Sequence, residues 1–143
     1  MDRRYIDNGE GIIKDSQTGL MWTKKDSWAD TGGCKDWNAS KSYVSNLTTG
    51  GYTDWRLPTV SELKLIYEKS KTNKDKDGDR IRLDPIFASG GAYWFWTSEA
   101  AGSSRARGVN FDGGFVGFIF GNVDDYGRDD WGSRGVRAVR FGH

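Results

Sequence analysis

Apolar and polar positions along the chain predict short strands at the beginning. Residues 4–6 are typical of a short edge strand. Residues 11–22 predict a hairpin, in which GIIKD and LMW form the strands and SQTG forms the turn. The polar residues 26–33 that follow predict a loop.

The middle of the chain predicts two helices. Residues 37–47 carry apolar side chains at helical spacing, and a Thr-Gly-Gly run then ends the pattern. A second helix is predicted to begin at Thr59, because Thr59 and Glu62 have the spacing of a capping box, in which each side chain satisfies a backbone N–H of the other. The charged residues 69–82 predict a loop.

The C-terminal half predicts short strands that are rich in aromatic residues. These strands are residues 93–97, 107–111, 115–120 and 136–141. Asp112-Gly113 predicts a tight turn, and residues 121–135 predict a long loop. Helices early and strands late are typical of an α+β fold with an antiparallel sheet. No repeat or linker interrupts the pattern, so we expect a single domain over residues 1–143.

Composition excludes several classes of function. The net charge is +1, so no overall field favours nucleic acid or an anionic membrane. No stretch is long and apolar enough to span a bilayer, and residues 1–4 lack the apolar core of a secretory signal. Cys34 and His143 are the only residues of their types, which argues against a disulfide, a zinc cluster or a His-based triad.

Residues 100–143, called the tail below, differ from the rest of the chain in composition. The tail contains no Lys, Glu, Gln or Met, and its charged residues are six Arg and five Asp. Randomising Asn codons at their adenines would give this pattern, because those missing residues need a purine at the third codon position. Trp131 is the one exception in the tail. The alternative is a Gly- and aromatic-rich β-region under ordinary selection, which favours Arg for bidentate or stacking contacts.

Three segments together resemble a known family. They are KDSQTGLMWTK at residues 14–24, GGYTDWRLPTVSELKLIY at residues 50–67, and the pair YWFWTSE and VRAVRF at residues 93–99 and 136–141. The chain resembles the domain at the C-terminus of collagen-like bacterial adhesins, a family similar to the C-type lectin fold in its formylglycine-generating-enzyme branch. The resemblance implies two helices, a twisted antiparallel sheet, and a ligand face of late strands and loops. It also implies that strand 4–6 pairs with strand 136–141.

The same fold is used by the variable proteins of diversity-generating retroelements, which vary a C-terminal surface on a fixed scaffold. Their variable region lies where this chain loses Lys and Glu, here residues 103–134. The leading hypothesis is therefore a non-catalytic binding module of this kind. It would bind a protein or carbohydrate ligand on a cell or virus surface, and we expect a location at a cell surface or on a virus particle.

The candidate ligand-binding residues are those of the tail that suit recognition, where Tyr, Trp and Arg dominate. They are Ser103, Arg105, Arg107, Phe115, Phe118, Phe120, Asn122, Asp124, Asp125, Tyr126, Arg128, Asp129, Asp130 and Arg134. The three Phe cannot all face one core from a single strand, so one face of the hairpin is expected to be exposed; alternatively they cover a second small core. Scaffold positions are predicted at Val109, Phe111, Trp131, Val136, Ala138 and Val139.

One loop resembles half of a calcium site. Its oxygen-bearing residues stand at alternate positions, and a Gly stands at the turn. This arrangement suits a hard cation. The oxygen-bearing residues are Asn73, Asp75, Asp77, Asp79 and Asp84. Lysines interrupt the loop, and Asp84 is shorter than the usual bidentate Glu, so we favour a solvated polar loop and expect no cofactor.

Two other functions compete with the leading hypothesis. An adhesin domain that holds sulfated polysaccharide would use the tail arginines, but the interspersed Asp residues cancel the field that an anionic polymer needs. An enzyme is the remote alternative. The carboxylates of Asp36, Asp54, Glu62, Glu68 and Glu99 form no evident pair. The oxidase chemistry of the formylglycine-generating branch needs two cysteines, and the chain has one.

Overall fold

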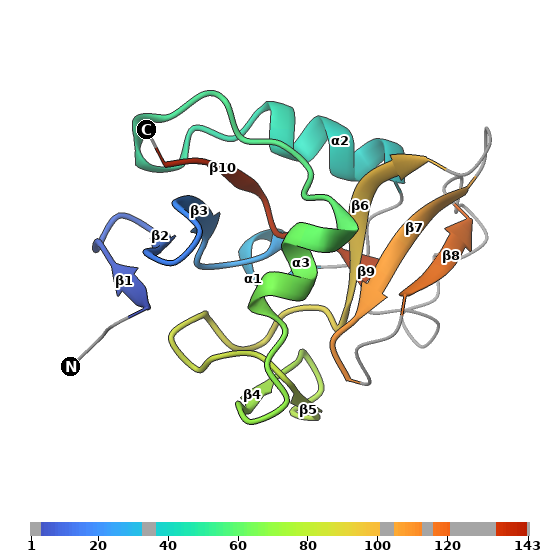
Figure 1. Cartoon of the computed structure of the whole chain (residues 1–143). Coiled ribbons are helices and arrows are strands. Elements are labelled where there is room, and N and C mark those ends of the chain that lie inside the picture. Colours follow the sequence, from blue (N-terminus) through green and yellow to red (C-terminus); the bar gives the residue numbers. More distant parts are fainter. Residues whose placement is uncertain (1–3, 33–36, 101–104, 113–115, 121–133, 143) are drawn as a thin grey trace.

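The structure is a computed structural model that describes residues 4–32, 37–100, 105–112, 116–120 and 134–142. Over these residues it is an α+β fold with three α-helices, two four-stranded sheets and one two-stranded sheet (Figure 1). The fold class predicted from the sequence is therefore confirmed. No helix among the described residues is long and apolar enough to cross a membrane.

The first sheet contains the first and last strands of the described chain. It consists of β1 (Tyr5–Asp7), β2 (Ile12–Asp15), β3 (Leu20–Thr23) and β10 (Val139–Phe141), all antiparallel, in the order β1-β2-β3-β10. The hairpin predicted at residues 11–22 and the edge strand before it are confirmed.

The predicted pairing of the first and last strands is wrong. β1 and β10 lie at opposite edges of the sheet, and β10 pairs with β3, with Phe141 opposite Leu20. The reason is connectivity, since short turns join β1 to β2 and β2 to β3, so each strand pairs with its neighbour in sequence. The last strand takes the outer edge of β3 and not that of β1, because the chain enters it alongside β3: Thr23 donates to the Ala138 carbonyl at 3.1 Å, and Gly142 donates to the Gly19 carbonyl at 2.8 Å.

Both predicted helices are present, and a third lies where the sequence predicted a loop. The helices are α1 (Ser27–Thr31), α2 (Trp37–Ser45) and α3 (Val60–Ile66), with a 3-10 turn at Thr49–Gly51. The capping box of α3 is confirmed, since Thr59 and Glu62 each bond the backbone N–H of the other. The short helix α1 forms because buried Asp26 caps it by accepting a hydrogen bond from the Ala29 amide at 2.8 Å.

The charged segment 69–82 was predicted as a loop and contains a small hairpin. β4 (Asn73–Lys74) pairs with β5 (Arg80–Ile81). Two backbone hydrogen bonds tie this hairpin to the segment before the second sheet: Gly90 donates to Lys74 at 2.9 Å, and Lys76 donates to Gly91 at 2.7 Å.

The second sheet carries most of the described tail. It consists of β6 (Trp94–Ala100), β7 (Arg105–Asn110), β8 (Val116–Phe120) and β9 (Arg134–Gly135), in the order β8-β7-β6-β9. The hairpin of β7 and β8 agrees with the sequence. The sheet is not wholly antiparallel, because β9 runs parallel to β6.

The last predicted strand is shorter than expected because the chain changes sheets within it. Residues 136–138 join β9 in the second sheet to β10 in the first. Their backbone carbonyls accept hydrogen bonds from other elements: the Ser27 amide donates to the Val136 carbonyl at 2.9 Å, and the Thr23 amide donates to the Ala138 carbonyl at 3.1 Å. This buried connection fixes the two sheets relative to each other.

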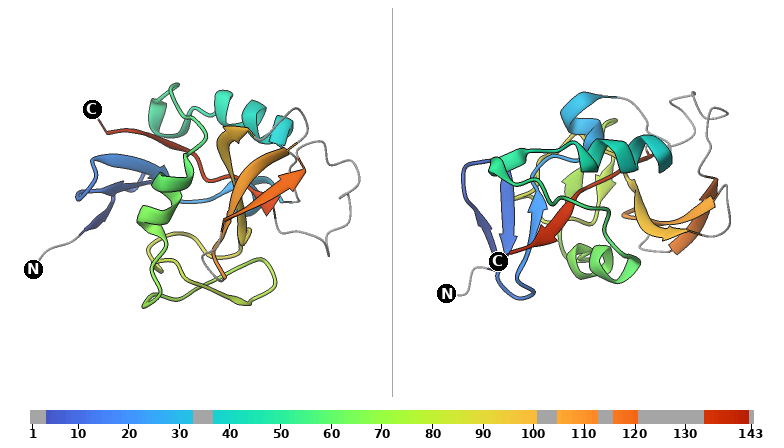
Figure 2. Two further views of the ribbon diagram at one scale, coloured as in Figure 1. Left: turned by 45° about the vertical axis from the view of Figure 1, so that its right-hand side comes forward. Right: turned by 90° about the horizontal axis from the view of Figure 1, so that it is seen from above.

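Two apolar clusters fill the interior. The first gathers side chains from both sheets and α3, among them Ile13, Trp22, Leu63, Phe95 and Phe111. The second includes Ile12, Val44, Trp55, Trp96 and Val136. Ile12 and Ile13 enter different clusters because successive side chains of a strand point to opposite faces. β2 is thus buried on both faces, while the hairpin of β7 and β8 lies at the far end of the molecule from β1 (Figure 2).

Candidate functional site

The predicted ligand face coincides only partly with the described residues. Arg107 is the one candidate of the tail whose side chain the structure describes. For four others the structure gives the backbone alone: Arg105, Phe118, Phe120 and Arg134. The rest lie outside the described residues: Ser103, Phe115, Asn122, Asp124, Asp125, Tyr126, Arg128, Asp129 and Asp130. Trp131 and Gly113, predicted as scaffold and turn, also lie outside them.

The register of β7 and β8 places four candidate positions side by side. Arg105 is opposite Phe120, and Arg107 is opposite Phe118. β8 is an edge strand, because its other side has no partner among the described strands. Four positions that are separated in sequence thus meet on one hairpin at the edge of the sheet.

Arg107 lies on the surface and is held by residues outside the tail. Its side chain is 43% exposed and lies 3.3 Å from the Glu99 carboxylate. Glu99 also accepts a hydrogen bond from the Val60 amide at 2.7 Å, at the beginning of α3. The described scaffold positions Val109, Phe111, Val136, Ala138 and Val139 are all fully buried, as predicted.

Arg137 is a buried arginine of the tail with a structural role. Its guanidinium donates to the carbonyl oxygens of Thr23 and Lys24 at 2.8 and 2.6 Å. The rings of Phe87 and Phe95 lie 4.9 and 5.7 Å from the guanidinium carbon. Burial lowers the pKa of Arg137, and the nearby negative charge of Asp26 opposes that shift.

Asp26 is the buried counter-charge. It is fully buried and accepts backbone hydrogen bonds from Ala29 and Ala92 at 2.8 and 2.7 Å. Burial raises the pKa of Asp26, while the positive charge of Arg137 and these hydrogen bonds oppose the shift. A side chain at Gly91 would collide with this carboxylate, since a Cβ there would lie 2.4 Å from an Asp26 oxygen.

The two most specific motifs of the sequence meet in space. Arg140 of the VRAVRF segment donates two hydrogen bonds, at 2.6 and 3.1 Å, to the carboxylate of Asp54 in DWRLPT. The hydrogen bond from Arg140 lowers the pKa of Asp54. The backbones of Arg56 and Val139 exchange hydrogen bonds at 2.9 and 3.0 Å. These motifs therefore form scaffold contacts between the middle and the end of the chain.

The candidate acid–base residues that the structure describes are each held by a structural partner. Glu62 contacts Arg56 at 2.9 and 2.7 Å while capping α3. Burial would raise the pKa of Glu62, but the hydrogen bonds from Arg56 and Thr59 together lower it. Glu68 contacts Arg4 at 3.2 Å. Asp36 and Cys34 lie outside the described residues.

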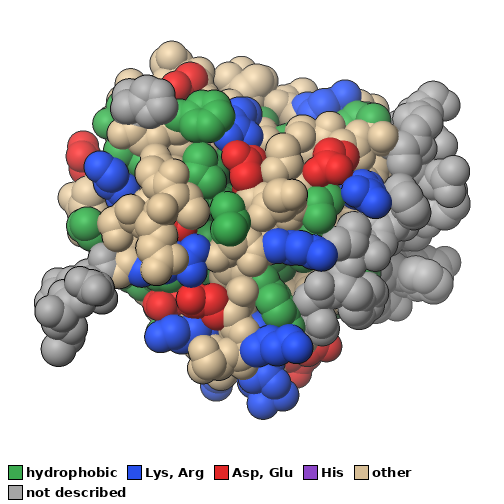
Figure 3. All heavy atoms as spheres, in the orientation of Figure 1, with side chains coloured by type: hydrophobic (Ala, Val, Ile, Leu, Met, Phe, Trp, Pro, Cys, Tyr) green, Lys and Arg blue, Asp and Glu red, His purple; other side chains and the backbone are tan. Residues whose placement is uncertain are grey.

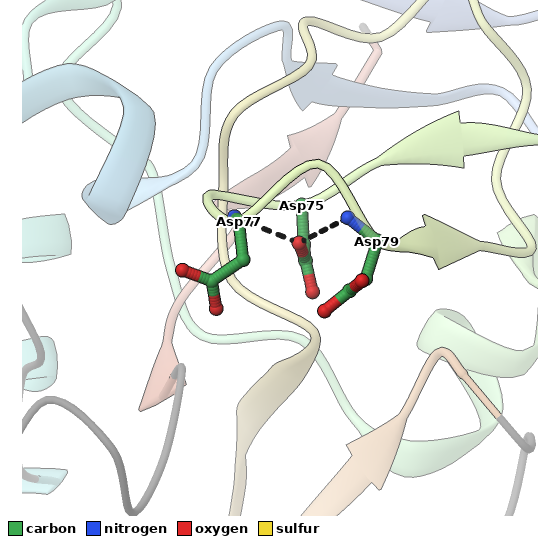
Figure 4. A group of neighbouring side chains, drawn as sticks. All are labelled: Asp75, Asp77 and Asp79. Atoms are coloured by element: carbon green, nitrogen blue, oxygen red, sulfur yellow. Dashed lines mark hydrogen bonds between the residues drawn. The ribbon is translucent and has the colours of Figure 1, made fainter.

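Three of the five calcium candidates come together, and two do not. Oxygen atoms of Asp75, Asp77 and Asp79 lie within 4.8 Å of one another. One Asp75 oxygen accepts the backbone N–H groups of Asp77 and Asp79 at 2.9 and 3.0 Å, which closes the turn (Figure 4). Asn73 instead points inward and donates to the Phe87 carbonyl at 2.8 Å. The Asp84 carboxylate accepts a hydrogen bond from the Ile86 amide.

The acidic turn borders a hollow that sequence reasoning missed. The hollow has a volume of about 790 Å³. The described residues that line it are Asp75, Asp77, Asp79, Arg80, Tyr93, Trp94, Asn110 and Asp112. They come from the β4–β5 hairpin, the beginning of β6 and the end of β7. No local pattern joins these segments, since their proximity depends on the backbone contacts at residues 90–91.

Charges of both signs are interspersed on the described part of the face that Figure 1 presents. Figure 3 shows Lys and Arg side chains alternating with Asp and Glu over the face of Figure 1. This face offers no large area of one sign to an extended polyanion.

Together, the fold and these contacts define a small α+β scaffold domain that carries the tail hairpin at the edge of its second sheet. The sequence profile of the Lcl C-terminal domain matches residues 11–140, so the chain belongs to the family of Lcl C-terminal domains. Membership fits a ligand-binding or adhesin-like domain, and it confirms the family resemblance that the motifs indicated. No curated protein matches the chain.

Proposed function

We propose that this protein is a non-catalytic ligand-binding module whose tail displays a diversified surface on a C-type-lectin-like scaffold, as in the variable proteins of diversity-generating retroelements. One observation carries the proposal. The chain loses Lys, Glu, Gln and Met from residue 100 onward, at the end of β6, where the hairpin of β7 and β8 begins.

The contacts of the described tail support a division into scaffold and surface. Arg137 and Arg140 are buried, and their bidentate and stacking contacts explain Arg in place of Lys at these two positions. Such contacts do not explain why the tail also lacks Glu, Gln and Met. Arg107, the one candidate with a described side chain, is on the surface.

The ligand of such a module would be a protein or carbohydrate on a cell or virus surface. Sulfated polysaccharide is the weaker candidate, because Arg137 and Arg140 are committed to the scaffold and the remaining tail arginines alternate with Asp. Catalysis is weaker still, because the described candidate carboxylates hold backbone or arginine partners.

Two matched libraries test the proposal. The first randomises candidate surface positions with codons that end in a pyrimidine: 103, 105, 107, 118, 120, 122, 124, 126, 128 and 130. The second randomises scaffold positions 109, 111, 136, 138 and 139 in the same way. We expect most members of the first library to fold and some to bind targets that the parent does not bind. Most members of the second should fail to fold, because large-to-small core changes each cost about 2–5 kcal/mol.

Failure of both libraries alike would contradict the proposal, since the tail would then be needed for folding throughout. A heparin column separates the polysaccharide alternative. Retention of the parent protein that falls steeply with salt would favour that alternative.

A further inference from the structure

We propose that the outer edge of β1 binds an extended, uncharged peptide segment of a partner protein, which adds a strand to the first sheet. β1 is the terminal strand of that sheet, and its outer side has no partner among the described strands (Figure 1). The backbone N–H and C=O groups of such an edge can pair with another strand. β1 lies outside the tail, so the inference does not depend on diversification.

The hydrogen bonds between β1 and β2 establish which backbone groups of β1 face outward. Bonds of 2.7 and 3.2 Å join the backbones of Arg4 and Asn8 to residues in and directly after β2. Because hydrogen-bonded pairs alternate along an antiparallel ladder, the residue midway between them, Ile6, also bonds β2. The N–H and C=O groups of Tyr5 and Asp7 therefore point to the open side, where they have no hydrogen-bond partner among the described residues.

A groove runs along this open side and is called the edge groove below. Its volume is about 580 Å³, which suits a peptide side chain and the backbone beside it. The described residues that line it are Tyr5, Ile6, Asp7 and Ile86. Successive side chains of a strand point to opposite faces, so a hollow lined by three successive residues lies along the edge of the strand. The segment of Ile86 is fixed in place, since the Asn73 side chain donates to the Phe87 carbonyl at 2.8 Å.

The chemistry of the edge groove favours an uncharged occupant with an apolar side chain. Ile6 is 46% exposed and stands at the centre of the edge. The charged groups at the two walls already have partners, since Asp7 contacts Lys24 at 2.8 Å and Asp84 contacts Lys71 at 3.8 Å. A charged occupant would therefore compete with existing ion pairs, whereas an apolar side chain would remove the exposed surface of Ile6 from water.

The size of the edge favours a short segment over a second copy of the chain. β1 has three residues, and Tyr5 and Asp7 each offer one N–H and one C=O group to a new strand. A stable dimer buries about 1,200–2,000 Å² in total. A strand pair of this length supplies only a small part of that area, but a short extended peptide needs no more than the edge and its groove.

The test is a titration with acetyl-Thr-Val-Thr-Val-Thr-amide, followed by amide chemical shifts and hydrogen exchange. The outward amides of Tyr5 and Asp7 should shift saturably and exchange more slowly, whereas the amide of Ile6, which already bonds β2, should change least. We expect a dissociation constant on the order of millimolar, because a short flexible peptide loses conformational freedom on binding.

Two matched peptides serve as controls. The first is the same peptide with every backbone nitrogen methylated, which keeps the side chains and removes the donors. It should bind about tenfold more weakly, the effect of losing two main-chain hydrogen bonds. The second, acetyl-Thr-Glu-Thr-Glu-Thr-amide, should also bind more weakly, because its charged side chains do not cover Ile6.

A pair of substitutions separates this edge from the rest of the apolar surface. Ile6→Thr keeps a residue that favours strands and removes most of the apolar contact, so it should weaken the peptide by about threefold or more. Phe141→Thr changes an exposed apolar residue on β10, at the opposite edge of the same sheet, and should leave the affinity unchanged.

The absence of a saturable shift, or equal binding of the methylated peptide, would overturn the proposal. Shifts of the Tyr5 and Asp7 amides that depend on protein concentration without peptide would overturn it too, because a second copy would then occupy the edge. Slow exchange of both amides before any peptide is added would show that the chain itself already covers this edge, and it would also contradict the proposal.

Discussion

Arginine side chains of the tail fall into two groups with different physical roles. Arg137 and Arg140 are buried, and each combines hydrogen bonds with an aromatic face, which Lys cannot reproduce. Arg107 lies on the surface, where it contacts the partly exposed carboxylate of Glu99. The sequence alone could not separate these groups, because burial of Arg137 depends on Asp26, which is 111 positions away.

Stability should therefore depend on the buried positions in β7 and directly after it, and little on the surface arginine of β7. We expect Val109→Ala and Phe111→Ala each to lower the free energy of unfolding by about 2–4 kcal/mol, from lost burial and the cavity left behind. Arg107→Ala should change it by less than about 0.5 kcal/mol, as ordinary surface changes do. Urea unfolding measures all three. Equal losses for Arg107 and Val109 would show that the surface side chain holds the fold together.

The buried charges at Arg137 and Asp26 should be strongly coupled. Arg137→Met removes one partner and leaves the other charge buried, which should cost about 3–5 kcal/mol of unfolding free energy. Adding Asp26→Asn, which keeps an oxygen for the α1 cap, should restore part of that loss. Denaturant unfolding of the two single variants and the double variant gives the coupling. Additive losses would contradict it.

At the scale of elements, the sequence predicted the elements that depend on neighbouring residues. It did not predict the elements that depend on contacts between distant residues. The β2–β3 hairpin and the capping box of α3 depend on residues within a few positions of one another, so the sequence carried the signal. Helix α1 was missed because its cap, Asp26, and its neighbour Ser27 are fixed by contacts with residues 92 and 136. The hollow was missed for the same reason.

The contact of α3 with Arg56 should make stability depend on pH in the acid range. The pKa of Glu62 is lowered in the folded protein, so the unfolded state binds more protons, and stability is lost as pH falls below the ordinary value of 4.5. Glu62→Gln should destabilise the protein near neutral pH. The difference from the parent should shrink as pH falls. Thermal unfolding across pH measures it, with Glu10→Gln as the control. A difference that stays constant would contradict the shifted pKa.

The acidic turn between β4 and β5 should not respond to calcium. Its cluster lacks Asn73 and Asp84, and one Asp75 oxygen is already occupied by two amides. A bound ion would raise the melting temperature by mass action. We expect the same melting temperature with calcium and with chelator. A rise with calcium that Asp75→Ala abolishes would establish a metal site.

At the scale of the whole molecule, the buried connection of residues 136–138 joins two sheets that are built from different parts of the chain. The first sheet holds both ends of the described chain, and the second carries the tail hairpin at its edge (Figure 1). The strand at that edge, β8, is not part of the first sheet, and it takes no part in the Asp54–Arg140 and Arg56–Val139 contacts. This separation is what a fixed scaffold with a variable surface requires.

The central claim, a diversified tail, is tested most directly by sequencing the DNA around the gene. The account predicts a near-copy of the 3′ coding end that differs only at adenines, beside a gene for a reverse transcriptase. Codons 103, 105, 107, 118, 120, 122, 124, 126, 128 and 130 should be among the differing positions, and codons 109, 111 and 131 should be identical. A locus with no such copy and no reverse transcriptase would contradict the claim, and the Arg and Asp bias would then need a cause in ordinary selection.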